Sequence, residues 1–174
     1  YMNVCAVFDN EEVGSGTKQG ADSTFLKDVL ERVSQKLGVD AEGYRCMLAE
    51  SFLISADNAH ALHPNHPEKA DAGNRPVMNN GIVIKYHGSQ RYATDAVSAA
   101  MMKDICLRAG VLYQSYANRS DIAGGSTLGN ISTAQVSVKT VDIGLAQLAM
   151  HSAYETAGAA DIAYLIQAFR TYYR

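Results

Sequence analysis

The chain of 174 residues lacks tryptophan and contains only three cysteines and three prolines. The thiols of Cys5, Cys46 and Cys106 are far apart in the sequence, without the CxxC spacing of a zinc ribbon or a thioredoxin-like motif. Because each lies among apolar neighbours, we expect buried, reduced thiols, as in a cytoplasmic protein. The cysteine content therefore argues against a disulfide scaffold and a cysteine-based metal site.

The sequence also lacks an excess of one charge and any long apolar run. Eighteen Asp and Glu against fifteen Lys and Arg give a formal net charge of −3, so the basic surplus typical of nucleic-acid-binding proteins is missing. No stretch of about 18 apolar residues could form a transmembrane helix, and no signal peptide is recognisable. We therefore expect a cytoplasmic protein that binds neither nucleic acid nor a membrane.

What the sequence does contain is the composition of one globular domain. Hydrophobic residues make up 47% of the chain, and its length allows a substantial core. Short apolar runs alternate with runs of helical period throughout, which predicts an α/β fold with a layered mixed sheet flanked by helices. The expected strands are residues 4–8, 51–56, 81–86, 112–117 and 138–143. The expected helices begin near residues 22, 94 and 144, with a break at Gly158 in the last.

Two adjacent glutamates, Glu11 and Glu12, follow the first expected strand, Val4–Phe8. In open α/β sheets, chemistry gathers beyond the carboxyl ends of strands. Neighbouring carboxylates point in different directions, so one could bind a metal ion while the other acts as a base. The alternative is a solvated acidic turn at the start of a helix, where negative charge suits the helix dipole.

A second expected strand ends in a carboxylate that is followed by histidines. Asp57 comes directly after the strand, and His60, His63 and His66 follow it. Histidines clustered beyond a strand-end carboxylate are typical of metal or acid–base sites. We take His60 as the candidate site residue, whereas His63 and His66 also fit an ordinary polar loop.

Three further features each allow a functional and a structural interpretation. Lys85 interrupts an otherwise apolar expected strand, as either a gatekeeper of an edge strand or a buried cation directed at an anion. The turn Gly124-Gly125-Ser126 leads into an expected helix, and its backbone N–H groups could bind an anion or a carbonyl. His151 lies in an apolar segment, where a lone histidine is more often a core residue than a ligand.

Four motifs follow one another along the chain. They are a strand followed by DNEEVGS, a strand followed by SADNAHALHPN, the turn GGSTLG, and DIGLAQLAMHS. Together with the intervening GIVIKYHGSQRYATDAV, they resemble the C-terminal part of the catalytic domain of the M18 family of metalloaminopeptidases, the aspartyl aminopeptidases. The resemblance implies a phosphorylase/hydrolase-like zinc-peptidase fold, present here in part, and a full-length protein that forms a homo-oligomer.

The resemblance also implies roles for ten residues. Glu11 matches the general base, and Glu12, Asp57 and His151 match ligands of two divalent metal ions, usually zinc. The residues that match substrate-contacting positions are His60, Lys85, Tyr92, Gly124, Gly125 and Ser126. The implied reaction removes the N-terminal residue of a peptide substrate. A lysine in the pocket favours an acidic residue there, Asp or Glu.

The metal shell that the resemblance implies is incomplete in this chain. The family pattern needs another histidine and a bridging aspartate upstream of the diglutamate, as well as an inserted dimerisation domain. We therefore expect residues 1–174 to be a single domain, the C-terminal portion of a metallopeptidase catalytic domain, which binds metal weakly and is inactive alone. Two other hypotheses stay open: an inactive binding or assembly module of the same fold, and a related dinuclear metallohydrolase such as a deacylase or carboxypeptidase.

Overall fold

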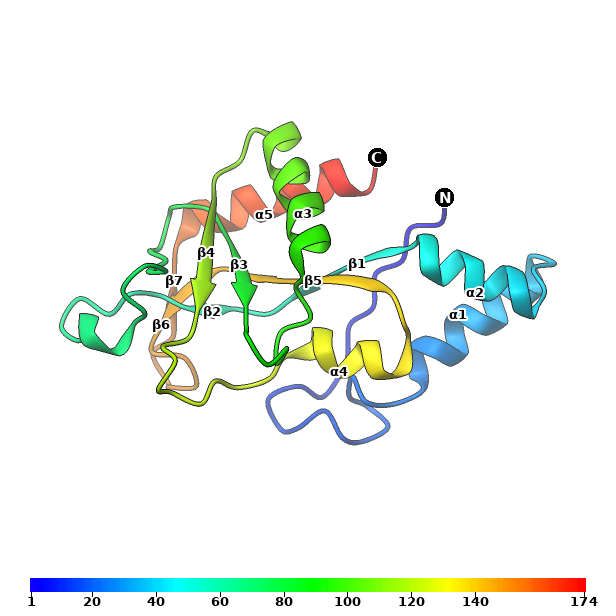
Figure 1. The fold of residues 1–174 in the computed structure, drawn as a ribbon, viewed down its shortest axis with the longest axis horizontal. Coiled ribbons are helices and arrows are strands. Elements are labelled where there is room, and N and C mark those ends of the chain that lie inside the picture. The colour runs from blue at the N-terminus through cyan, green and yellow to red at the C-terminus, as the bar shows by residue number, and fades with distance from the viewer.

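A four-stranded mixed sheet forms the centre of the computed structural model, which describes residues 1–174 (Figure 1). Its strands are β1 (Phe52–Ala56), β3 (Ile82–Tyr86), β4 (Tyr113–Ala117) and β5 (Lys139–Gly144). In the order β1-β5-β3-β4, the two outer pairs are parallel and the central β5–β3 pair is antiparallel. A smaller sheet follows the ends of β1 and β5, and it consists of β2 (Ala59–His60), β6 (Ala146–Leu148) and β7 (Thr156–Ala157).

Five α-helices flank the sheet. They are α1 (Phe25–Lys36), α2 (Ala41–Glu50), α3 (Ala96–Ala109), α4 (Leu128–Gln135) and α5 (Ala159–Tyr172), with a 3-10 turn, η1, at Pro67–Lys69. Helices α3 and α5 pack together above the sheet, whereas α4 lies below it against β1 and β5 (Figure 1). None of the helices combines the length and hydropathy that crossing a bilayer requires. The predicted α/β class, a layered mixed sheet flanked by helices, is confirmed.

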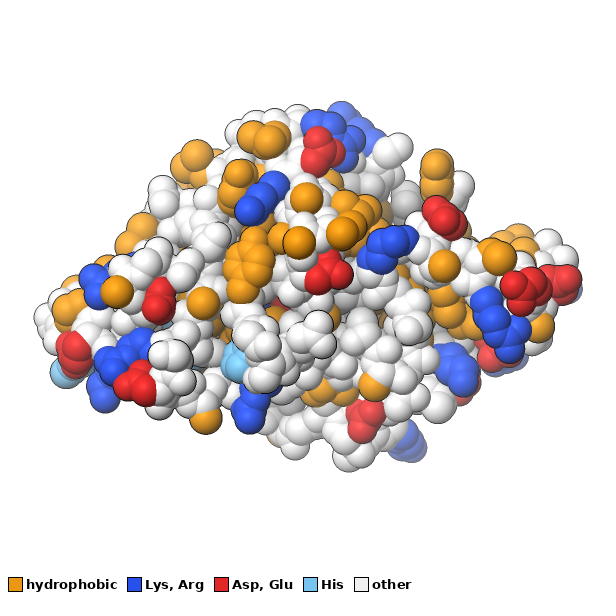
Figure 2. Space-filling model, in the orientation of Figure 1, with side chains coloured by type: hydrophobic (Ala, Val, Ile, Leu, Met, Phe, Trp, Pro, Cys, Tyr) orange, Lys and Arg blue, Asp and Glu red, His pale blue; other side chains and the backbone are white.

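Helices α1 and α2 project from one end of the sheet (Figure 1). Acidic and basic side chains are mixed over this projection, and hydrophobic side chains gather around α3 on the same face of the molecule (Figure 2). Both signs of charge are scattered over the rest of that face, consistent with the small net charge of −3.

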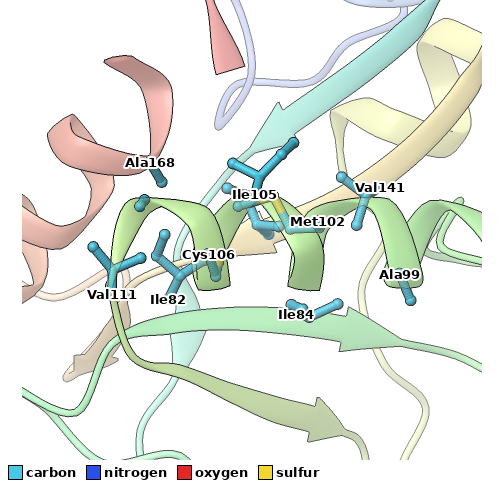
Figure 3. Close-up of a cluster of buried hydrophobic side chains, with 11 residues drawn as sticks. Ile82, Ile84, Ala99, Met102, Ile105, Cys106, Val111, Val141 and Ala168 are labelled. Carbon is cyan, nitrogen blue, oxygen red and sulfur yellow. The ribbon is translucent and has the colours of Figure 1, made fainter. Parts of the chain in front are cut away.

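Strand β3 divides its side chains between two cores. Successive residues of a strand point to opposite faces, and Ile82 and Ile84 belong to the cluster under α3 and α5 that Figure 3 shows. Val83 belongs to the second cluster, on the other face. Because β3 is a central strand covered on both sides, Lys85 is only 2% exposed. Of the two interpretations of Lys85, the structure therefore supports the buried cation.

Helix α3 begins and ends with recognisable capping residues. The Asp95 carboxylate accepts the Ser98 N–H at 2.7 Å, and the Ser98 hydroxyl oxygen accepts the Asp95 N–H at 2.9 Å, which is a capping box. Gly110 closes the helix in the left-handed conformation, with φ of 65°. The cap thus lies one position after residue 94, where the sequence predicts the helix to begin, and the Thr94 hydroxyl instead accepts the Asp142 N–H.

Asp161 fastens α5 to the loop before β3. Its carboxylate is fully buried and accepts the backbone N–H groups of Asn79 at 2.7 Å and Gly81 at 2.8 Å. Without this carboxylate, both donors would lose their acceptor in a site from which water is excluded.

We therefore expect Asp161→Ala to lower the free energy of unfolding by about 2–4 kcal/mol, since each unpaired buried donor costs about 1–3 kcal/mol. The matched control is Asp104→Ala, which removes an exposed carboxylate paired with Arg108 on α3; its effect should stay within about 1 kcal/mol. Urea denaturation of both variants measures the difference, and equal losses would contradict the role of Asp161.

The predicted first strand, Val4–Phe8, is wrong. The segment is irregular and open to solvent, with Val7 84% exposed. It is anchored near its start, where Asn3 Nδ2 donates to the Tyr173 carbonyl at 2.9 Å and the Tyr173 hydroxyl donates to the Val4 carbonyl at 3.3 Å. A strand needs a neighbouring strand to satisfy its backbone groups, and in this structure β1 pairs only with β5.

The helix predicted from residue 144 is also wrong in its first half. The segment Gly144–Leu148 continues from β5 into β6, and only α5 is helical. All residues from 141 to 147 are buried. A short apolar run that is buried on all sides has no periodicity that separates strand from helix.

The expected burial of the cysteines is correct for one of three. Cys106 is buried beneath α3, and burial raises the pKa of its thiol to about 11. Cys5 and Cys46 are exposed, because the segment and the helix that carry them lie at the periphery of the fold.

Candidate active site

One cavity of about 570 Å³ opens beside the small sheet. All ten residues singled out from the sequence line it: Glu11, Glu12, Asp57, His60, Lys85, Tyr92, Gly124, Gly125, Ser126 and His151. They come from five stretches of the chain that are far apart in sequence. The fold thus brings the candidate residues to one place, whatever their individual roles.

Glu12 and His151 form one wall of the cavity. His151 Nε2 lies 2.7 Å from Glu12 Oε2, and the two side chains are 66% and 65% exposed. His151 belongs to the turn after β6 and has a φ of 67°; its backbone N–H donates to Glu155 Oε1 at 2.6 Å. A left-handed conformation costs free energy in a residue other than glycine, and such residues cluster at functional sites.

Glu11 lies deeper in the same wall than its neighbour Glu12. Partial burial raises the pKa of its carboxyl, and the negative charges of Asp57 and Glu12 act in the same direction. The positive charges of Lys85 and His151 oppose them. The backbone around Glu11 is held by a turn, since its carbonyl accepts the Gly14 N–H at 2.9 Å.

Lys85 holds the end of β1 in place. Its ammonium donates to the carbonyl oxygens of Asp57 at 2.9 Å and Asn58 at 3.3 Å, and to Asp57 Oδ2 at 3.4 Å. The Tyr92 ring centroid lies 5.1 Å from the same nitrogen. Burial lowers the pKa of Lys85, and the carboxylates of Asp57 and Asp142 oppose this shift.

Gly144 allows β5 to pass close to Asp57. A Cβ atom at Gly144 would lie 2.1 Å from the Asp57 carbonyl oxygen, which no side chain could tolerate without movement. A backbone hydrogen bond joins the same two segments, since the Asp57 N–H donates to the Ile143 carbonyl at 3.0 Å. The glycine of the DIG motif therefore helps to place the Asp57 carboxylate.

Three aromatic rings that contact one another also line the cavity. The ring of Tyr116 lies 6.3 Å from that of Tyr92 and 6.5 Å from that of His60, and its hydroxyl donates to Asn118 Oδ1. Burial raises the pKa of Tyr116 to about 12 and also raises that of Tyr92. Desolvation lowers the pKa of His60, and the charges of His151 and Lys85 add to this effect.

The turn Gly124–Ser126 also lines the cavity, just before the N-cap of α4. Arg91 donates to the Gly124 carbonyl oxygen, and the Ser126 hydroxyl donates to Asn130 Oδ1 at 2.7 Å. Thr127 caps α4. Arg91 and Thr127 were not predicted as site residues from the sequence, although Arg91 directly precedes Tyr92 in the motif that resembles the family.

The donor types present fit a zinc ion, but their number does not complete its shell. Catalytic zinc is held by three protein ligands and a water or substrate. Glu12 and His151 offer two suitable donors side by side, whereas Asp57 is bonded to Lys85. Nowhere in residues 1–174 do three His, Cys, Asp or Glu side chains gather closely enough to hold a metal ion.

Known proteins match the chain over nearly its whole length. A family model described as "Aminopeptidase I zinc metalloprotease (M18)" matches residues 1–173. A "Probable M18 family aminopeptidase 2" of Clostridium acetobutylicum is 50% identical over 171 residues, which are 98% of this chain and 40% of that protein. Its namesake from Mycobacterium tuberculosis H37Rv is 46% identical over 163 residues, covering 94% of this chain and 38% of that protein.

Solved structures agree with these matches. A chain in the cryo-EM structure of the Ape4 and Nbr1 complex superimposes with a TM-score of 0.92 at 39% identity, covering 95% of this chain and 31% of its own. The mApe1 dodecamer of S. cerevisiae gives a TM-score of 0.82 at 33% identity, covering 95% and 36%. The present chain spans about two fifths of the length of the curated relatives it matches.

Proposed function

Because the chain belongs to the M18 family of zinc metalloproteases, we propose that it supplies part of the active site of a longer aminopeptidase, which removes the N-terminal residue of a peptide. The observation that carries this proposal is the convergence of ten candidate residues, from five stretches of sequence, on one cavity. A binding module would have no need to keep a potential base beside potential metal ligands.

In this proposal Glu12 and His151 bind one divalent ion and Asp57 binds a second, with the remaining ligands contributed by the rest of the longer protein. Such ions, when bound, supply Lewis-acid polarisation of the scissile carbonyl. Glu11 takes the proton of the attacking water and delivers it to the leaving amine. His60 and Tyr92 contact the substrate, and the backbone of Gly124–Ser126 lines its other side.

An activity assay of the zinc-loaded full-length protein with chromogenic aminoacyl amides tests this proposal. Turnover of substrates with a free N-terminal amine, and none of their N-acetylated counterparts, would support an aminopeptidase. Preference for the acetylated or C-terminally free substrates would point to a deacylase or carboxypeptidase, and no turnover at all to an inactive module. We propose that residues 1–174 alone bind zinc weakly and have no activity, so robust turnover by this chain would contradict that part.

We further propose that the first residue of the substrate is acidic, because Lys85 is the most deeply buried cation of the cavity wall. The longer protein is also proposed to be a homo-oligomer, as the mApe1 structure is described as a dodecamer.

Lys85→Met is expected to lower the ratio of kcat/KM for a glutamyl over a leucyl amide by about 10- to 100-fold, because the buried positive charge that attracts an acidic side chain is lost. Lys69→Met is the matched control, since Lys69 is an exposed cation on the same cavity wall; it should leave the ratio unchanged. If Lys85 served only to hold Asp57, both substrates would lose activity equally and the ratio would stay constant, which would contradict the specificity role.

A further inference from the structure

Asp142 is a carboxylate buried in the middle of β5, with no exposed surface. Both of its neighbours along the strand, Val141 and Ile143, belong to the core under α3 and α5. Burying a carboxylate is unfavourable unless its oxygens are hydrogen-bonded. Asp142 has no role in the proposed reaction. Its hydrogen-bond partners therefore indicate which parts of the fold it connects.

Each oxygen of Asp142 has one donor, and the two donors come from different segments. Oδ2 accepts the backbone N–H of Ala93 at 2.6 Å, and Oδ1 accepts the hydroxyl of Thr127 at 2.7 Å. The carboxylate also lies close against the first turn of α4, because a Cβ atom at Gly129 would come within 2.3 Å of Oδ1. The side chain thus bridges the loop after β3 and the start of α4.

The two bridged segments carry two neighbouring parts of the cavity wall. Tyr92, 6% exposed, directly precedes Ala93, and Gly124–Ser126 directly precedes Thr127. Both Tyr92 and the turn line the cavity, whereas Asp142 does not. Arg91 reinforces the connection by donating to the Gly124 carbonyl oxygen.

A carboxylate suits this bridge better than an amide. It presents an acceptor to each of two donors, whereas an asparagine side chain has only one acceptor oxygen and presents an NH2 group to the other partner. With asparagine, either the Ala93 N–H loses its acceptor, or the amide NH2 donates to the Thr127 hydroxyl oxygen and the hydroxyl proton loses its acceptor.

We propose that Asp142 is a positioning residue for the substrate-binding side of the cavity. Its two oxygens join Ala93 to Thr127 and so fix the position of Tyr92 relative to Gly124–Ser126. This inference rests on the proposed function, in which those residues contact the substrate. The metal-binding wall with Glu12 and His151 is not held by Asp142.

The test compares Asp142→Asn, Thr127→Val and a matched control, Asp161→Asn, in the zinc-loaded full-length protein. Asp161 is an equally buried carboxylate that accepts two backbone N–H groups away from the cavity. We expect Asp142→Asn to raise KM about 10-fold and Thr127→Val about 3-fold, with kcat within about 3-fold of the unsubstituted enzyme, since the lost hydrogen bonds affect substrate binding. Asp161→Asn should lower the melting temperature and leave KM unchanged.

An unchanged KM in both folded Asp142→Asn and folded Thr127→Val, or equal changes in the Asp142 and Asp161 variants, would overturn the proposal in favour of a purely structural role. If Asp142→Asn does not fold, Thr127→Val decides by the same criteria. If the unsubstituted enzyme has no turnover, the proposed function fails. Amide hydrogen exchange then tests whether the Asp142 carboxylate holds the two segments together. Faster exchange in residues 88–95 and 122–128 of Asp142→Asn, absent from Asp161→Asn, supports it, and unchanged exchange there overturns it.

Discussion

Glu11→Gln is expected to lower kcat of the full-length enzyme by about 10²- to 10⁴-fold, the usual contribution of a general base. Glutamine preserves the shape of the side chain and its acceptor oxygen, but it cannot accept a proton from water at neutral pH. Because Glu11 lies beside Glu12 without being one of the proposed ligands, KM and bound zinc should change little. Steady-state kinetics with an aminoacyl amide, alongside the zinc content of the same samples, measures both quantities.

The neighbouring carboxylate of Asp9 offers a control for this substitution. Asp9 belongs to the same loop but is exposed and does not line the cavity, so Asp9→Asn should retain nearly full activity. Two results for Glu11→Gln would contradict the role of Glu11 as the base. One is a kcat within about 3-fold of the unsubstituted enzyme, and the other is a loss of activity that follows a loss of zinc.

Strands β3 and β4 and helices α1 and α3 were predictable because local pattern and tertiary environment agree there. The run around Ile84 is apolar on both faces of a covered sheet, and α3 has clear capping residues in Asp95 and Gly110. Helix α2 was not predicted. Its amphipathic pattern is weak and Tyr44 is its only buried residue, so little in the sequence distinguishes it from a polar connection.

The wrong predictions for Val4–Phe8 and Gly144–Leu148 have one physical cause, since the outcome depended on partners distant in sequence. Val4–Phe8 has the composition of a strand, but no strand lies beside it in this structure. Ala146–Leu148 forms strand β6 because β2 and β7 flank it on either side. Pairing of this kind is a property of the folded chain, and a local window does not contain it.

Convergence of the candidate site was predictable only through the order of its motifs, because no local pattern places Asp57 near His151. The residues that hold these motifs together were missed. Tyr116 and Asn118 lie in a segment that reads as strand and loop, and Asp142 lies inside an apolar run. A charged residue within an apolar run indicates a buried charge that needs specific partners. Lys85 was singled out for this reason, and Asp142 has the same pattern.

His151→Ala is expected to weaken zinc binding by the full-length enzyme by at least about 100-fold and to reduce turnover in parallel. Loss of a residue that merely orients a ligand already costs about 10- to 100-fold in metal affinity, and removing a ligand itself should cost more. Glu12→Ala should behave similarly, because its carboxylate lies 2.7 Å from His151 Nε2 and the two would face the same ion. Competition with a chromogenic chelator measures the affinity.

Two further variants separate a ligand from a nearby histidine. His66→Ala removes another exposed histidine of the same cavity and should leave zinc affinity unchanged, because that ring is paired with Glu68 at 3.2 Å. Glu155→Gln weakens the acceptor that holds the left-handed backbone of His151 at 2.6 Å, so an intermediate loss of about 10-fold is expected. If His66→Ala released zinc and His151→Ala did not, the ion would belong to the histidine loop after β2, and the wall formed by Glu12 and His151 would lose its proposed role.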